Sequence, residues 1–188
     1  MRTINNTLKI SILATLCALS VVLATVVRFP LFPSAPYLEF DAGDVAILVG
    51  TFMYGPLSGV LITLIVSLIQ GVTVSAASGL WGILMHFVST SFFCIVCGYI
   101  YHRRANRIIL ATALLTGVVF TTILMIPLNL IITPLYTGAP QSFVASILIP
   151  TIIPFNLIKF AINAILAFGL WSVLELVIKN IRGKKNVG

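Results

Sequence analysis

The chain has 188 residues, of which 60% are hydrophobic and only 8% are charged, and its mean hydropathy is +1.16. A soluble domain carries roughly 25% charged residues, so this composition excludes a water-covered globule and predicts a protein that lies mostly in lipid. The formal net charge of +7 does not indicate a nucleic-acid partner, because the basic residues flank apolar segments and no basic patch with aromatic or polar readers occurs.

Apolar segments of membrane-spanning length follow one another along nearly the whole chain. Each transmembrane helix needs about 20 residues, so six or seven spans would leave no room for a soluble domain. We therefore predict one domain, residues 1–188, of the all-α membrane class, built as a bundle of six helices. The expected spans are about 8–27, 44–54, 57–72, 80–101, 108–132 and 154–178, with Ser142–Ile153 as a short helix or re-entrant segment before the last.

The basic residues predict the orientation of these spans. Nine of the eleven lie at the two ends of the chain or in the 101–107 loop, and cytoplasmic segments of membrane proteins carry an excess of Lys and Arg. Six spans place these three segments on one side, whereas seven would put the C-terminal basic cluster outside. We expect both termini to be cytoplasmic and the loops 29–43, 73–79 and 133–141 to be extracellular.

The first span carries small residues within one narrow arc. Small side chains let helices approach closely in lipid, so this face either packs within the bundle or docks another membrane subunit. The Gly55-x-x-x-Gly59 pair after the second span is expected to pack internally. The residues on the first-span arc are Ser11, Ala14, Ala18 and Thr25.

The loop 29–43 holds apolar side chains that water would not favour. Tyr37, Leu38 and Phe40 follow a Pro-rich stretch, so we expect the loop to fold back over the mouth of the bundle as a lid. Asp41 or Asp44 is expected to cap the N-terminus of the second span, since Asp commonly accepts a backbone N–H there.

Polar residues that lipid should exclude recur in the third span. Gly59, Thr63, Ser67 and Gln70 share one helical face. This face either forms hydrogen bonds between helices or lines a cavity.

The last span carries Asn156, Lys159 and Asn163 on one face. A lysine costs about 2.5 to 3.5 kcal/mol at the centre of a membrane span, so Lys159 either extends its ammonium outward to water or faces a pocket. The two amides beside it favour the pocket. Asn129, which follows Pro127 in the fifth span, adds an amide at the same depth. This convergence predicts a binding site for a polar ligand near the outer face.

Several chemistries find no support in the sequence. No P-loop occurs, so the chain should not hydrolyse ATP. His86 and His102 stand apart, so no metal site is expected, and no acidic relay crosses the bilayer. A binding protein without its own energy source suggests a partner that supplies the energy. An intramembrane enzyme using Asp44 or His86 has the weakest support, and a purely structural assembly subunit would bind no small ligand.

Three segments resemble a known family of membrane proteins. They are Pro36–Val45 continuing to Phe52–Gly59, Leu128–Tyr136, and Ile152–Lys159. On these the chain resembles the substrate-binding S components of energy-coupling factor (ECF) vitamin transporters, and among them the riboflavin-binding ones. Relatives carry Lys-Asn where this chain has Val66-Ser67, and that departure bears on affinity or on the choice of ligand.

The resemblance implies a riboflavin-binding site at the extracellular side, closed over by the first outer loop. Asn129, Asn156 and Lys159 match residues that hydrogen-bond the flavin, and hydrophobic side chains cover its ring. The alternative with the same fold is another vitamin or a flavin-like precursor as the ligand. The substrate-binding residues expected in this chain are Asn129, Asn156, Lys159, Tyr37, Leu38, Asp44, Trp81 and Phe155.

The resemblance also implies partners and a location. Ala14 and Ala18 on the first span would dock a membrane coupling subunit that two ATPase subunits drive. The chain would then be a multi-pass protein of a prokaryotic plasma membrane. Riboflavin would be its transported ligand, with no cofactor, no metal and no catalysis of its own.

Overall fold

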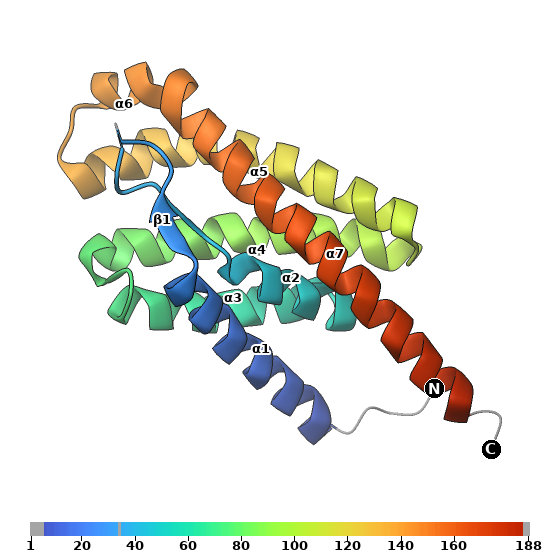
Figure 1. Ribbon diagram of the computed structural model, residues 1–188. Helices are drawn as coiled ribbons and strands as arrows, with labels where there is room; N and C mark the ends of the chain where they lie inside the picture. The colour runs from blue at the N-terminus through green and yellow to red at the C-terminus, as the bar shows by residue number, and fades with distance from the viewer. Residues whose placement is uncertain (1–5, 34, 186–188) are drawn as a thin grey trace.

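The protein is described by a computed structural model that covers residues 6–33 and 35–185 (Figure 1). It is mostly helical, as its composition predicts. The elements in this part of the chain are α1 (Asn6–Val26), β1 (Arg28–Pro30), β2 (Glu39–Asp41), α2 (Gly43–Tyr54), α3 (Pro56–Val72), the 3-10 turn η1 (Ala76–Ser78), α4 (Gly79–Arg103), α5 (Arg107–Thr137), α6 (Gln141–Ile147), the π-helical turn η2 (Leu148–Ile152) and α7 (Ile153–Lys185).

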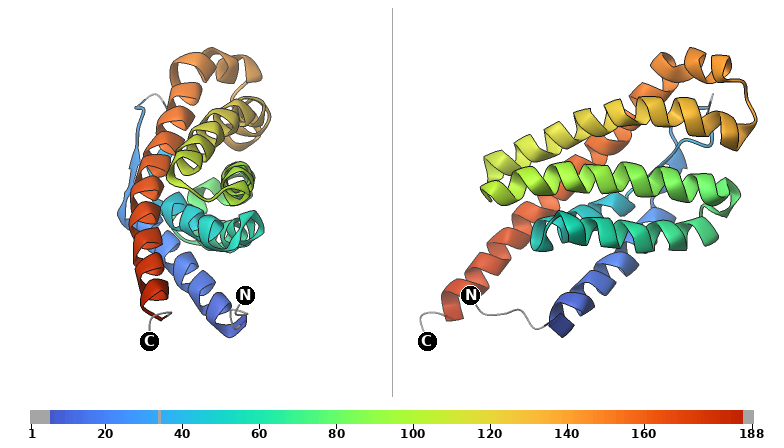
Figure 2. Two further views of the ribbon diagram at one scale, coloured as in Figure 1. Left: turned by 90° about the vertical axis from the view of Figure 1, so that its right-hand side faces the viewer. Right: turned by 180° about the vertical axis from the view of Figure 1, so that it is seen from behind.

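The long helices run up and down along one another. Figure 2 shows the start of α1 and the end of α7 at one end of the bundle, and β1 and α6 at the other. The turn between α4 and α5 lies at the same end as the start of α1 (Figure 1). We call the end with β1, β2 and α6 the hairpin end and the opposite one the basic end, because exposed Arg103, Arg104 and Arg107 lie there.

The short helix α2 lies at the centre of the bundle. Its residues from Gly43 to Phe52 are all buried, and it packs against α1, α3, α4 and α7. Its twelve residues span only about 18 Å along the helix axis. The longer helices around it shield it from lipid. It ends as predicted at Gly55, whose φ of 97° suits glycine, and Pro56 opens α3.

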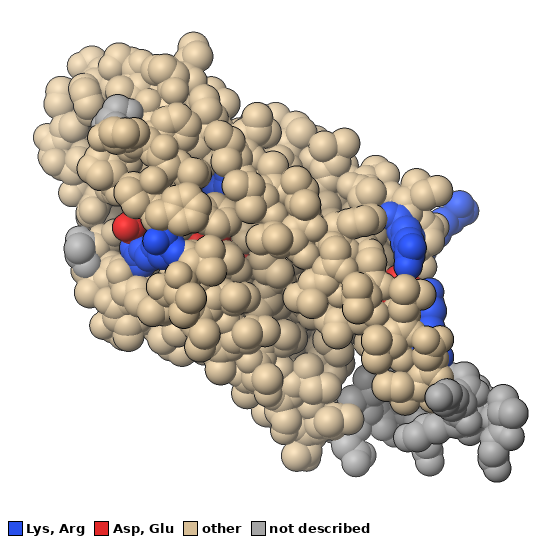
Figure 3. Space-filling model, in the orientation of Figure 1, with Lys and Arg blue, Asp and Glu red and all other residues tan. Residues whose placement is uncertain are grey.

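Among the described residues, four helical stretches are long and apolar enough to cross a membrane, namely α1, α4, α5 and the continuous stretch Gln141–Ile181. Helices α2 and α3 are shorter and also apolar. Six crossings therefore remain a prediction. Large apolar side chains such as Leu57 and Ile108 are about four-fifths exposed on the outside. On the face drawn in Figure 3, charged atoms gather toward the two ends of the molecule.

Helix α5 is longer than its sequence suggests. Residues 133–141 were expected to form a loop after a helix ending at Ile132, but α5 continues to Thr137 with Pro127 and Pro134 inside it. Prolines are tolerated in helices packed within a membrane bundle because neighbouring groups satisfy the freed carbonyls. The helix stops at Gly138, whose φ of 71° is left-handed. The short helix expected in the segment Ser142–Ile153 is confirmed as α6.

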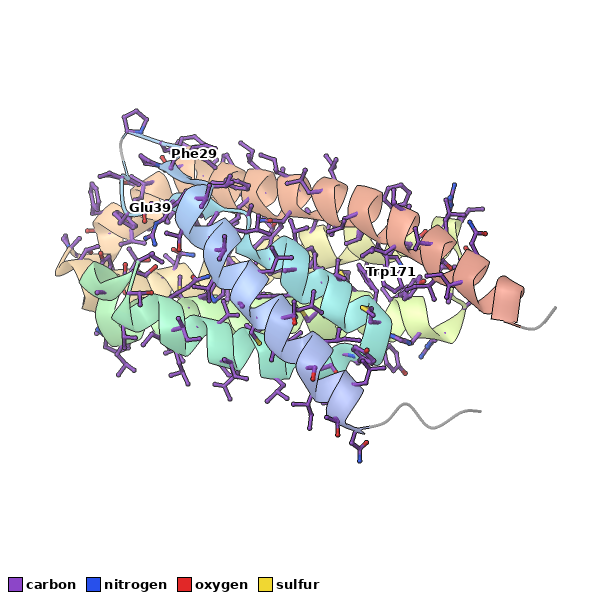
Figure 4. The ribbon with its side chains drawn as sticks, turned by 60° about the horizontal axis from the view of Figure 1, so that its bottom comes forward. Phe29, Glu39 and Trp171 are labelled. Atoms are coloured by element: carbon purple, nitrogen blue, oxygen red, sulfur yellow. The ribbon has the colours of Figure 1, made fainter. Side chains whose placement is uncertain are left out.

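The Pro-rich first loop contains a small antiparallel hairpin that was not predicted from the sequence. Phe29 pairs with Phe40 in its register, and their ring centroids lie 5.3 Å apart. Leu38 belongs to a buried cluster with Val144 of α6 and Phe155 of α7. Figure 4 shows labelled Phe29 and Glu39 at one end of the bundle, far from Trp171. The loop thus covers the hairpin end, as a lid would.

The small residues of the first span point away from the bundle. Ser11, Ala14, Ala18 and Thr25 are exposed, whereas the buried side of α1 is formed by Leu16, Cys17, Ser20 and Ala24. Packing of the small-residue face within the bundle is therefore wrong. The other explanation, a docking face, stays a prediction.

Gly59 provides a test of the central packing. A Cβ atom there would lie 2.0 Å from Thr51 Oγ1 and 2.9 Å from Cys94 Cβ, whereas one at Gly169 would meet nothing within 4 Å. We predict that Gly59→Ala lowers the free energy of unfolding by about 1–3 kcal/mol. Gly169→Ala is the matched control and should leave stability unchanged or raise it, because Ala favours the helix. Equal effects in detergent unfolding curves would contradict this packing.

Candidate ligand-binding site

A cavity lies at the hairpin end of the bundle. It holds about 1000 Å³ of empty space, part of it open to the outside. Its walls come from the first loop and from α3, α4, α5 and α7. Small-molecule sites commonly combine an apolar lining with a few polar groups, and this cavity has both.

Three residues from α5 and α7 form what we call the amide wall: Asn129, Asn156 and Lys159. The sequence predicted that these side chains would converge, and all three line the cavity. Asn129 Nδ2 donates to the carbonyl oxygen of Met125 at 2.8 Å, and Asn156 Nδ2 donates to that of Ile152 at 2.8 Å. Each carboxamide is thus held by its own helix, which fixes the orientation that it presents to the cavity.

Lys159 is paired inside the cavity and does not extend to the surface. Its ammonium lies 2.7 Å from Asp41 Oδ2, and both side chains are more than four-fifths buried. Asp41 Oδ1 accepts the N–H of Gly43 at 3.0 Å, and Asn163 Nδ2 donates to the Asp41 carbonyl oxygen at 3.0 Å. The alternative that Lys159 reaches outward is therefore wrong.

The Asp41 carboxylate is stabilised in its charged form. Burial on its own would raise the pKa of Asp41, but the charge of Lys159, the charge of His86 and hydrogen bonds from Lys159 and Gly43 hold that pKa below its ordinary value. The ion pair is thus maintained at neutral pH. Since an ammonium has three N–H donors, Lys159 keeps donors for a ligand.

A second set of polar side chains comes from α3 and α4, and we call it the polar wall: Ser67, Gln70 and His86. His86 Nδ1 lies 2.7 Å from Ser67 Oγ, and His86 Nε2 lies 3.3 Å from Asp44 Oδ1. Of the polar face predicted on the third span, Ser67 and Gln70 line the cavity. Thr63 donates instead to the carbonyl oxygen of Gly59.

The apolar residues expected in the site also line the cavity, namely Tyr37 and Leu38 from the first loop, Trp81 from α4 and Phe155 from α7. Tyr37 packs edge-on against Tyr136 of α5, with ring centroids 6.0 Å apart. The lid and the end of α5 therefore close one side together.

Asp44 does not lie where it was expected. It is completely buried and does not line the cavity; its Oδ1 accepts the Thr90 hydroxyl at 3.0 Å and faces His86 behind the polar wall. Neither Asp is the N-cap residue of α2, since Ala42 occupies that position without a side-chain cap. Asp41 comes one residue earlier and accepts the Gly43 N–H from there.

Sequence reasoning missed three residues of the site. Asp41 was assigned only a capping role, His86 was expected neither in a metal site nor among the ligand-binding residues, and Arg28 was not assigned to the site. Arg28 pairs with Glu39 across the hairpin and donates to Ser75 Oγ at 2.9 Å, so it joins the lid to the α3–α4 connection. The feature of the sequence that could have identified them is that each is a titratable residue in or beside an apolar segment.

Comparison with known proteins gives consistent matches over most of the chain. The family model for the substrate-specific component of ECF transporters matches residues 8–171. The riboflavin transporter FmnP of Bacillus subtilis (strain 168) is 29% identical over 160 residues, covering 80% of this chain and 83% of that protein. The riboflavin transporter RibU of Staphylococcus aureus (strain TCH60) is 27% identical over 163 residues, covering 84% and 85%. A solved S component of a bacterial ECF transporter superposes with a TM-score of 0.79 at 28% identity, covering 91% of this chain and 97% of that one.

The ion pair in the cavity gives a prediction for stability. Lys159→Met should lower the free energy of unfolding by about 3 kcal/mol, because it leaves the buried Asp41 carboxylate without its partner. Lys179→Met is the matched control. Lys179 is 67% exposed and pairs with Glu175 within α7, so its loss should cost less than about 1 kcal/mol.

The double variant Asp41→Asn/Lys159→Met tests the pairing itself. It should recover part of the stability that Lys159→Met loses, because no unpaired charge remains. Strictly additive losses in detergent unfolding curves would contradict the pairing.

Proposed function

The chain belongs to the substrate-specific components of ECF transporters, and from this premise we propose that it binds riboflavin as the capturing subunit of an uptake system. Its homologues are transport proteins and not enzymes. Ser67, His86 and Asp44 meet as a hydroxyl, an imidazole and a carboxylate, and because the homologues are transport proteins we assign this set no catalytic role.

The observation that carries the proposal is the composition of the cavity. The flavin ring is flat and aromatic and has carbonyl and N–H groups along one edge. The amide wall offers both donors and acceptors to that edge. Trp81, Phe155 and Tyr37 offer aromatic surface to the ring faces. A site built this way holds a neutral ring without needing a strong anion-binding group.

The lid completes this arrangement. Asp41 lies in β2 and Lys159 in α7, so their ion pair fixes the first loop against the helix that carries two of the three amide-wall residues. A ligand that binds next to Lys159 would therefore act directly on the ion pair that holds the loop. We infer that capture of riboflavin and ordering of the lid are coupled through this pair.

We further propose that the energy comes from partners. The protein would lie in the plasma membrane of a prokaryote with six crossings and cytoplasmic termini, and a membrane coupling subunit with two ATPases would drive it. The exposed small residues Ala14 and Ala18 form the docking face. Close helix packing through small residues suits such a contact in lipid.

Ligand binding gives the first test of this proposal. Purified protein should quench the fluorescence of added riboflavin at one ligand per chain. Lys159→Ala should weaken binding roughly 10- to 100-fold, because a hydrogen bond from a charged donor contributes about 1.5–3 kcal/mol. Lys179→Ala, at the basic end, should bind like the wild type. Folded protein that does not quench riboflavin fluorescence but binds another vitamin in a competition panel would contradict the riboflavin assignment.

Docking is tested separately from ligand binding. Ala18→Leu should reduce cellular riboflavin uptake several-fold and leave the affinity of the purified protein unchanged, since the added side chain obstructs only the outer face of α1. Ala111→Leu is the matched control, because Ala111 is also exposed, on α5. Similar uptake by the two variants would rule out this docking face.

A further inference from the structure

A second hollow lies on the outside of the bundle, at the end opposite the ligand cavity. It has about 760 Å³ of empty space, part of it open to the outside, between the start of α1 and the start of α3. In both views of Figure 2 the start of α1 leans away from the rest of the bundle. We call the space between these two helices the basic-end groove.

The walls of the basic-end groove are mostly apolar, and their side chains face outward. Ile10 and Leu57 are 65% and 81% exposed, and both line the groove. Leu13 and Leu61 continue this lining about one turn further along α1 and α3. Lipid tails are as apolar as leucine, so a groove lined in this way can hold an acyl chain along its length.

Polar side chains from both helices lie at the outer end of the same groove. Asn6 and Lys9 come from the first turn of α1, and Ser58 comes from the first turn of α3. The ammonium of Lys9 lies 5.6 Å from the centroid of the Tyr54 ring, and this cation–π contact holds it beside the groove. An ammonium has three N–H donors, and an aromatic ring does not use them as a hydrogen-bond acceptor would.

The charge of Lys9 is not balanced by the acidic side chains of the protein. The chain has four acidic residues. Three of them lie at the hairpin end, where they contact Arg28, Lys159 and His86. The fourth, Glu175, is paired within α7. Lys9 is therefore available to an anion from outside the chain.

We propose that the basic-end groove binds one phospholipid with an anionic headgroup. Lys9 pairs with the phosphate, Asn6 donates to headgroup oxygens, and an acyl chain lies between α1 and α3. A free phosphate would leave the apolar walls uncovered, and a lipid without net charge would leave Lys9 unbalanced. Basic pockets between transmembrane helices bind anionic lipids by this combination. The site goes beyond the capture of riboflavin and does not depend on it.

The test is lipid binding to the purified protein, measured by native mass spectrometry during titration with phosphatidylglycerol or phosphatidylcholine. The wild type should bind one phosphatidylglycerol several-fold more tightly than phosphatidylcholine, whose choline group cancels the phosphate charge. Lys9→Gln should lose about fivefold in phosphatidylglycerol affinity, which is the contribution of one lysine near an anionic lipid. Arg104→Gln is the matched control and should bind like the wild type, because Arg104 is an exposed cation at the basic end outside the groove.

A second variant obstructs the groove and leaves every charge in place. Ile10→Trp should weaken phosphatidylglycerol binding at least about fivefold, because the indole occupies the path of the acyl chain. Ile108→Trp is its control, since Ile108 is 78% exposed at the start of α5 and does not line the groove. Ile10 and Ile108 are both exposed, so melting curves in lipid-free detergent should match that of the wild type.

The outcomes distinguish a defined site from general attraction to the basic end. Equal losses in Lys9→Gln and Arg104→Gln would overturn the site, because Lys generally reaches toward headgroups from a helix end. Phosphatidylglycerol binding that Ile10→Trp leaves unchanged would overturn it as well. Displacement of the lipid by soluble glycerol phosphate would show that the phosphate binds without the acyl chain, and it would also contradict the proposal. None of these results bears on riboflavin binding, which concerns the opposite end of the bundle.

Discussion

The contact between Lys159 and Asp41 decides how the hairpin end of this bundle is organised. The two residues are 118 positions apart in sequence, and their charged atoms lie 2.7 Å apart among helices with apolar outer surfaces. Neither charge could be buried there alone, because an unpaired ion in such surroundings costs several kcal/mol. The pair therefore brings the first loop onto α7, and the cavity forms beneath that loop.

The pairing of charges also determines what the cavity can hold. Lys159 is balanced by Asp41, and His86 faces Asp44. The groups left to face a ligand are mostly amides, hydroxyls and aromatic rings. Such a surface favours a flat, neutral molecule with polar edges over a strongly charged one. Membership of the ECF substrate-specific components and homology to riboflavin transporters are consistent with such a ligand.

Features that depend on one helix or on local backbone preferences could be predicted from the sequence. The face of Asn156 and Lys159 follows from helical periodicity, and the Gly55-Pro56 break follows from local backbone preferences. Sequence reasoning failed where partners came from distant segments. The link of Lys159 to Asp41, the hairpin in the Pro-rich loop and the place of Asp44 behind the polar wall all depend on packing between elements. The extension of α5 past Pro134 was missed because a proline ends a helix less readily inside a bundle.

The central claim is that this cavity holds a flavin. The most direct measurement is the absorption spectrum of the protein purified from its native membrane without added ligand, followed by extraction and quantification of any bound chromophore. We expect a flavin spectrum, with the extracted molecule carrying an intact ribityl chain at up to one per protein chain. Folded protein that carries no flavin, and whose cavity takes up none when riboflavin is added, would contradict it.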